Sequence, residues 1–244
     1  MRYLIRFFKL IAVVAISFGL FSCESTTKVK VLVITGGHDY DEKGFNQLLE
    51  LLPIDYDLVK HPDALTMLEP ENIKHYRTVL LYDMPDEITE KAKSDFVAML
   101  EDGTGLVVLH HAVCSYRNWP EYMRIVGGRY AHTPWMKDTI LQPASTYQHD
   151  VELLVKVGEL EHPVTEGVGD FMIVDETYAN MEILQTVHPL LFTDEPTSSP
   201  LVCWVNRYGN ARIVTLTLGH DRQAWDNPSF IQILTQAVLW TAEQ

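Results

Sequence analysis

Short apolar segments that alternate with helical patterns constrain the fold of this chain more than any other feature. The segments at residues 78–82 (TVLLY) and 105–109 (GLVVL) contain no charged side chain. A strand that is apolar on both faces is typical of a parallel sheet covered by helices. Between them, residues 88–100 show the spacing of a helix with one apolar face. This order predicts an α/β fold with a doubly wound, mostly parallel sheet.

Further elements follow the same logic. A strand is predicted over residues 28–35, where apolar residues become continuous before Gly36-Gly37. The remaining predicted elements are a helix from Phe45 to Leu52, strands at 56–60, 151–157 and 171–174, and a closing helix at 229–242. Residues 201–206 and 212–218 are predicted to pair as a late hairpin through Tyr208-Gly209-Asn210. The segment 116–151, rich in aromatics, Gly, Pro and His, is predicted to be a long functional loop.

The first residues have the pattern of an export signal. Arg2, Arg6 and Lys9 precede an apolar run over residues 10–21, and polar residues follow at 24–28. The run is well short of the ~20 residues that a membrane-spanning helix needs. Its end, Leu20-Phe21-Ser22-Cys23, resembles the lipobox that precedes a lipidated cysteine. We expect a lipoprotein signal, although an ordinary secretory signal with an incidental cysteine also fits.

The expected organisation is a signal peptide at residues 1–22, a tether at 23–29 and one domain at 30–244. Lipid on Cys23 would be the only contact with a membrane. The protein is then an anchored extracytoplasmic lipoprotein, facing the periplasm or lying on the cell surface.

The net charge of the mature chain limits which partners and substrates it is expected to bind. Without the three basic signal residues, 19 − 3 = 16 Lys and Arg stand against 33 Asp and Glu, a net charge near −17. Such a surface repels phosphate backbones, so we expect no nucleic-acid partner and a neutral or cationic substrate. Cys114 and Cys203 lie far apart in sequence and do not make a disulfide framework; we expect two buried thiols, and a single bridge between them is the alternative.

Histidines and acids follow several of the predicted strands. His38 and Asp39 come after the first strand, and His110-His111 come after residues 105–109, where a sharp turn presents the nucleophile in hydrolase folds. Asp175-Glu176-Thr177-Tyr178 follow the strand at 171–174. His220 and Asp221, with Trp225 beyond them, follow the strand at 212–218.

Each of these groups has a structural alternative, such as a helix cap or a hydrogen-bonded core histidine. Several strand ends that each deliver a His or an acid favour a common site, because ligands bind beyond the carboxyl ends of parallel strands. In the long loop, Arg129, His132 and Trp135 combine a cation, an imidazole and an aromatic face. The remaining histidines are interpreted as surface or turn residues: His61, His75, His149, His162 and His188.

Taken together, these landmarks resemble the ThuA-like, or trehalose-utilisation, family. The matching pieces are 105–110, Gly127-Gly128-Arg129, His132 with Pro134-Trp135, 162–167, 175–178, 200–209, and Leu218-Gly219-His220 followed by Trp225. The resemblance implies a flavodoxin-like fold of the class I glutamine amidotransferase type. It also implies a role in the breakdown of trehalose and other disaccharides, with a companion oxidoreductase that makes 3-keto sugars.

Glutaminase chemistry is not expected, because it needs a Cys thiolate at the strand-to-helix turn. His110-His111 occupy that turn here, and Cys114 lies several residues further on.

The favoured function is acid–base cleavage or isomerisation of disaccharides or their 3-keto derivatives. A 3-keto group acidifies neighbouring C–H bonds, so the reaction needs a base, an acid and a group that stabilises an enolate. The catalytic candidates are His38, Asp39, His110, His132, Glu176 and His220. The substrate-binding candidates are Arg129, Trp135, Tyr178, Asp221 and Trp225.

Other readings stay open at this point. A divalent metal such as zinc could hold the enolate through some of the same histidines and the carboxylate, but no ligand set can be assigned from spacing. A non-catalytic sugar-binding lipoprotein would use Trp135, Tyr178 and Trp225 for stacking. A scaffolding lipoprotein that has lost its chemistry is the third alternative.

Overall fold

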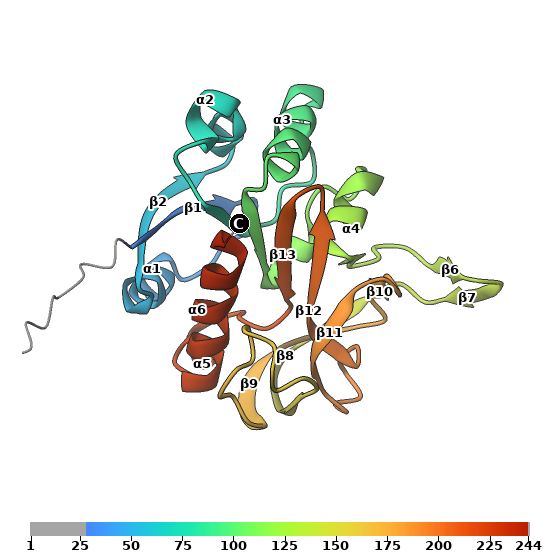
Figure 1. Cartoon of the computed structure of the whole chain (residues 1–244). Coiled ribbons are helices and arrows are strands. Elements are labelled where there is room, and N and C mark those ends of the chain that lie inside the picture. Colours follow the sequence, from blue (N-terminus) through green and yellow to red (C-terminus); the bar gives the residue numbers. More distant parts are fainter. Residues whose placement is uncertain (1–27, 244) are drawn as a thin grey trace, which may run out of the picture.

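The computed structural model describes residues 28–243 (Figure 1). The predicted signal peptide, Cys23 and the tether up to residue 27 lie outside this part, and Val29 already belongs to the first strand. None of the helices in the described part is both long and apolar enough to cross a membrane.

One half of the central sheet is parallel. Its strands lie in the order β2-β1-β3-β4-β13 and all run in one direction. Their bounds are β1 Val29–Gly36, β2 Ile54–Lys60, β3 Thr78–Asp83, β4 Gly105–Leu109 and β13 Ala211–Leu216. The prediction of a doubly wound α/β fold with a parallel core is confirmed.

The other half of the sheet is antiparallel and larger than expected. It continues from β13 in the order β12-β11-β8-β9. The bounds are β12 Leu201–Tyr208, β11 His188–Phe192, β8 Thr146–Val157 and β9 Phe171–Ala179. The predicted hairpin between β12 and β13 is confirmed. The sheet is therefore mixed, since β11 was not predicted and β8 and β9 pair as a second hairpin.

Helices cover both faces, as Figure 1 shows. One apolar cluster joins α1 (Glu42–Leu51), α5 (Arg222–Trp225) and α6 (Pro228–Ala242) to the sheet. The opposite cluster holds η1 (Asp63–Leu68), α2 (Pro70–Ile73), α3 (Glu90–Glu101) and α4 (Pro120–Val126). Along β1, alternate residues join opposite clusters, and residues 31–34 are all buried. Burial on both faces explains why this strand is continuously apolar.

Capping side chains determine where several helices begin. The Asp41 side chain accepts the Gly44 N–H at the start of α1, and Thr89 accepts the Ala92 N–H at the start of α3. Asn227 caps α6, and Pro228 occupies its first turn, where a missing N–H costs nothing.

The region at 116–151 is more regular than a loop. It contains α4, the short strands β5 (Gly128–Arg129), β6 (Trp135–Lys137) and β7 (Ile140–Gln142), and the start of β8. Strand β5 pairs with β10 (Glu182–Ile183). The β6–β7 hairpin projects from the body of the molecule (Figure 1).

The direction of β9 positions the candidate site. Four successive antiparallel pairings separate β9 from β13, so the two strands run the same way. Strand β9 also packs against α5, which follows β13, and a register shift interrupts β8 between Gln148 and Val151. The prediction that the strand ends at residue 174 is wrong, because residues 175–178 belong to β9 itself. This brings the C-terminal part of β9 to the edge where the parallel strands end.

Candidate functional site

The turn after β4 presents an imidazole. β4 passes directly into the 3-10 helix η2 (His110–Cys114), and His110 has a φ of 51°. A non-glycine residue in this left-handed conformation costs roughly 1–3 kcal/mol and is typical of functional sites. The side chain is 1% exposed. The expected sharp turn is therefore present, and it points a histidine into the interior of the site.

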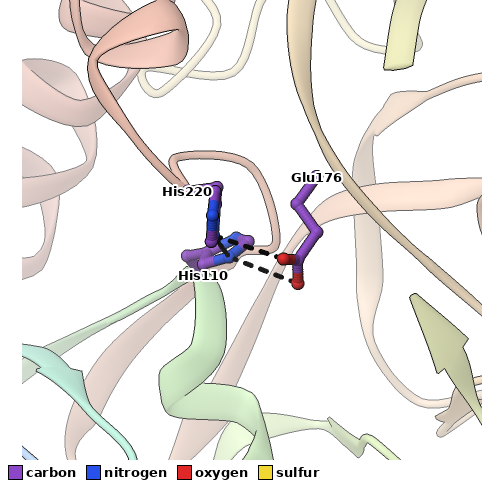
Figure 2. Close-up of side chains that lie close together, drawn as sticks. All are labelled: His110, Glu176 and His220. Atoms are coloured by element: carbon purple, nitrogen blue, oxygen red, sulfur yellow. Dashed lines mark hydrogen bonds and ion pairs between the residues drawn. The ribbon is translucent and has the colours of Figure 1, made fainter. Parts of the chain in front are cut away.

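His110 meets residues from two other segments, as Figure 2 shows. Its Nε2 lies 3.2 Å from His220 Nδ1 and 3.8 Å from Glu176 Oε1. His220 Nδ1 lies 3.3 Å from Glu176 Oε2. His220 follows β13 and Glu176 comes from β9, so three segments far apart in sequence converge.

The hydrogen bonds of His110 define its tautomer. Its Nδ1 lies 2.8 Å from the Thr217 carbonyl oxygen, which can only accept, so Nδ1 carries the proton. Nε2 is then an acceptor, and the Tyr178 hydroxyl donates to it at 2.9 Å. Burial, with His111 and His220 nearby, holds the pKa of His110 well below its ordinary value. The imidazole is therefore neutral, and its Nε2 lone pair faces the cluster.

Asp175 joins two of the converging segments. Its carboxylate accepts the backbone N–H groups of Gly219 at 2.6 Å, His220 at 2.9 Å and Glu176 at 2.8 Å. Burial raises the pKa of Asp175 to about 7, and these hydrogen bonds act in the opposite direction. Asp175 is a positioning residue, because it holds the loop of His220 against β9.

His149 is a member of the site that the sequence interpretation missed. Its Nδ1 lies 2.8 Å from Glu176 Oε2, and its side chain is 52% exposed. The interpretation of His149 as a surface residue agrees with this exposure, but it missed that β8 carries the side chain beside Glu176, where it lines the site. Pairing of β8 with β9 was the missing information, and nothing in the spacing of the sequence signals it.

A cavity of about 300 Å³ opens above the cluster, at the lower end of the size range of small-molecule sites. Its lining combines imidazoles, phenols and one carboxylate: His38, Met84, His110, His111, Cys114, Tyr130, His132, Tyr147, His149, Glu176, Tyr178 and His220. His111 is 3% exposed, and both of its ring nitrogens lack a hydrogen-bond partner among the described residues. Burial, with His38 and His220 nearby, lowers its pKa to about 3. A bound ligand could supply its partner.

Of the predicted catalytic residues, five line this cavity: His38, His110, His132, Glu176 and His220. Asp39 does not, since it lines a neighbouring pocket with Glu42 and Lys60 that shares His38. The structure therefore does not bring Asp39 to the cluster of His110, Glu176 and His220, and its catalytic role stays a prediction.

Fewer of the predicted substrate-binding residues than of the catalytic ones lie at the cavity. Tyr178 lines the cavity. Trp225 is 2% exposed and packs in the core, with its Nε1 donating to the Gly219 carbonyl, so the prediction of an open stacking face is wrong. Asp221 instead caps α5 by accepting the Gln223 N–H.

The two remaining residues of the loop lie outside the cavity lining. Arg129 pairs with Glu182 and lines a neighbouring pocket that shares His132. Trp135 lies on the projecting hairpin and donates to the Asn180 carbonyl. Neither residue is among those that line the cavity.

A second buried His–Asp pair lies at the end of β3. His61 Nε2 is 2.7 Å from Asp83 Oδ2, and the two side chains are 10% and 0% exposed. His61 does lie in a turn, directly after β2, but its side chain faces inward rather than toward the surface. Burial raises the pKa of Asp83, and His61 lowers it.

Both described cysteines are free and buried, which confirms the expectation of two thiols. Burial raises the pKa of Cys114 and of Cys203. A raised pKa is the opposite of what a thiolate nucleophile requires.

These observations define a class: a doubly wound α/β protein of the flavodoxin-like and glutamine amidotransferase-like type, with a histidine–carboxylate centre where its strands end. The family model described as "ThuA: Trehalose utilisation" matches residues 30–241. The chain belongs to the ThuA family, and its role is related to trehalose utilisation. Among curated proteins, none matches this chain.

Solved structures share the fold. A ThuA-like protein from Parabacteroides merdae has a TM-score of 0.74 at 22% identity, covering 88% of this chain and 90% of that one. A ThuA-like protein from Bacteroides uniformis has a TM-score of 0.67 at 19% identity, covering 91% and 95%. PurLQS from Thermotoga maritima has a TM-score of 0.56 at 11% identity, covering 88% and 99%. At these identities the likeness concerns the fold alone.

Proposed function

We propose that this protein cleaves glycosides whose sugar carries a 3-keto group. The observation that supports this most is the convergence of His110, His149, Glu176 and His220 beneath one cavity. Proton transfer and enolate stabilisation need this set of groups. Family membership supports the carbohydrate substrate.

The reaction is an elimination that balances without an oxidant or reductant. A base takes the proton from C2, next to the C3 carbonyl, and the C–H electron pair forms an enolate. The enolate then re-forms the carbonyl, a double bond forms between C1 and C2, and the C1–O bond breaks. The departing oxygen takes a proton from an acid, and water adds to the unsaturated product to give the free 3-keto sugar.

The geometry supports His149 as the base. Its Nδ1 faces Glu176 Oε2 at 2.8 Å, so a proton on Nδ1 would be held by the carboxylate. Nε2 is then left to accept the substrate proton, as in other carboxylate–histidine pairs. His111 is placed to donate to the carbonyl oxygen, since its ring lines the cavity and has no hydrogen-bond partner among the described residues.

Two rival functions have less support. A thiol nucleophile is disfavoured because His110 occupies the turn and Cys114 is buried with a raised pKa. A pure sugar binder has less support because two of the three aromatic residues expected to stack a sugar are not in the cavity: Trp225 is buried and Trp135 lies elsewhere, so that only Tyr178 lines it. Imidazoles and a carboxylate dominate instead.

The reaction is proposed to take place outside the cytoplasm, on a lipid-anchored protein. We propose that residues 1–22 direct export and that Cys23 carries lipid, as the lipobox-like Leu20-Phe21-Ser22-Cys23 suggests. A companion sugar oxidoreductase would supply the 3-keto glycoside, because elimination requires that carbonyl.

The test compares p-nitrophenyl 3-keto-glucoside and 3-keto-trehalose with the same glycosides lacking the keto group. We expect release of the aglycone from the keto substrates alone, and deuterium at C2 of the product in D₂O. His149→Ala and Glu176→Gln should each lower the rate ~10²–10⁴-fold. His188→Ala is the matched control, because His188 also pairs with a glutamate, Glu159, but lies on the surface.

Equal cleavage of the unmodified glycosides would contradict the enolate route. Exchange at C2 without release of the aglycone would indicate isomerisation, which shares the first step. Loss of rate in the His188→Ala control equal to that in His149→Ala would contradict the assignment of the site.

A further inference from the structure

We propose that His110, Glu176 and His220 are the protein ligands of a divalent transition-metal ion. The inference rests on the proposed function only in taking this cluster as the reacting centre. Its evidence is separate, namely the geometry, charge and hydrogen bonding of the three side chains.

The donor atoms form a triangle of suitable size. His110 Nε2 lies 3.2 Å from His220 Nδ1, and the Glu176 carboxylate faces both, with Oε2 3.3 Å from His220 Nδ1 and Oε1 3.8 Å from His110 Nε2 (Figure 2). Ligands 2.0–2.1 Å from a tetrahedral zinc ion lie about 3.3 Å apart. Small side-chain movements would therefore seat an ion, and one ligand atom from each residue lies within 4.8 Å of the others.

The charge of the cluster favours a cation. Glu176 is 7% exposed, and its ion-pair partners among the described residues are three histidines. Of the described residues that line the cavity, none is Lys or Arg. The carboxylate of Asp175 lies directly behind the cluster. Three backbone N–H groups satisfy Asp175, whereas the buried Glu176 carboxylate has no fixed cation; burying such a charge is costly, and a divalent ion would offset that cost.

Hydrogen bonds behind the ligands orient them as metal sites require. The Thr217 carbonyl accepts the Nδ1 proton of His110, so Nε2 carries the lone pair that an ion would bind in place of the hydrogen bond from Tyr178. Asp175 holds the backbone of both Glu176 and His220. His149 is placed to donate to Glu176 Oε2, leaving Oε1 free. Metal-bound histidines and carboxylates usually have such partners, which fix tautomer and orientation.

The cavity side of the cluster remains open for substrate. His110, Glu176 and His220 all line the cavity, so an ion among them would face it. The unpartnered ring of the buried His111 lies on the same cavity. Three protein ligands with an open position are typical of catalytic rather than structural metal sites. The ion would polarise the C3 carbonyl of the sugar and hold the enolate oxygen.

Ligand chemistry narrows the choice of metal. Two imidazole nitrogens and one carboxylate suit zinc, iron(II), cobalt(II) or manganese(II), whereas calcium and magnesium prefer oxygen ligands. The ion named here is therefore a first-row transition metal.

The experiment titrates protein treated with EDTA with Zn²⁺ and with Co²⁺, without substrate, by calorimetry and visible absorption. We expect one ion per chain and Co²⁺ bands of low coordination number. Glu176→Gln, which keeps the shape of the side chain, and His220→Gln, on a loop, should each weaken binding by at least about 100-fold, given that partners behind ligands already contribute 10–100-fold. His188→Ala should bind as the wild type does.

Wild-type affinity no higher than that of a folded Glu176→Gln protein would overturn the inference, as would an equal loss in the His188→Ala control. Circular dichroism establishes that each variant is folded. Because binding is measured without substrate, the two proposals fail separately. Keto-glycoside cleavage that persists fully after removal of metal contradicts the metal site alone, whereas specific metal binding without cleavage supports the site and contradicts the proposed reaction.

Discussion

Replacing Gly219 with alanine should strongly destabilise the protein and displace His220. Gly219 has a φ of 112°, and a Cβ atom there would lie 2.9 Å from Phe230 Cζ and 3.3 Å from Leu109 Cδ1. Phe230 is fully buried in the core, so its ring would have to displace neighbouring core side chains to make room. The left-handed backbone costs an alanine roughly 1–2 kcal/mol. Forcing a methyl group into a packed core costs about 1–3 kcal/mol more.

The expected loss in the free energy of unfolding is therefore about 2–5 kcal/mol. Urea unfolding followed by circular dichroism and by tryptophan fluorescence measures it, with the m-value checked for two-state behaviour. The Gly219 N–H donates to Asp175 Oδ2, so a shift of this residue should also move His220 away from the cluster.

Gly169→Ala is the matched control. A Cβ atom at this position would meet nothing within 4 Å, and its φ is not positive. The control should be neutral or stabilise by up to about 1 kcal/mol, because alanine restricts the unfolded chain. If Gly219→Ala lowers the free energy of unfolding by less than about 1 kcal/mol, or by as much as the control does, a Cβ atom at this position does not clash with Phe230 as expected.

Three further predictions test other parts of the structure. His61→Ala removes the histidine partner of the buried Asp83, so the pKa of Asp83 should rise further. A carboxyl whose pKa is raised in the folded state contributes stability below its unfolded pKa of about 3.9, and this stability is lost as pH rises. The loss in free energy of unfolding relative to wild type should therefore grow with pH, to about 3–5 kcal/mol at pH 8 in urea unfolding. A deficit that shrinks with pH would contradict this. Cys114 and Cys203 should react with a thiol reagent only after unfolding, since both are buried and burial raises their pKa values. Rapid labelling of the native protein would instead indicate a reactive thiol. Cys23→Ser should release the protein from membranes in cell fractionation, and full retention would remove the lipid anchor.

Local sequence pattern was enough to predict the parallel half of the fold. Residues 78–82 and 105–109 are apolar on both faces, and such segments have few alternatives to a buried parallel strand. The same logic placed His110 at the turn after β4 and His220 after β13, because the carboxyl ends of parallel strands share one edge. These predictions depended only on local pattern and on a general rule of sheet topology.

Long-range contacts, in contrast, select the side chains that complete the site. Pairing of β8 with β9 brings His149 to Glu176, and the return of β9 toward α5 sets Asp175 against Gly219. Burial of Trp225 follows from packing between α5 and the sheet, which its position after a strand does not reveal. Contacts between antiparallel strands depend on register and curvature over the whole sheet, and these arise from long-range packing rather than from local sequence.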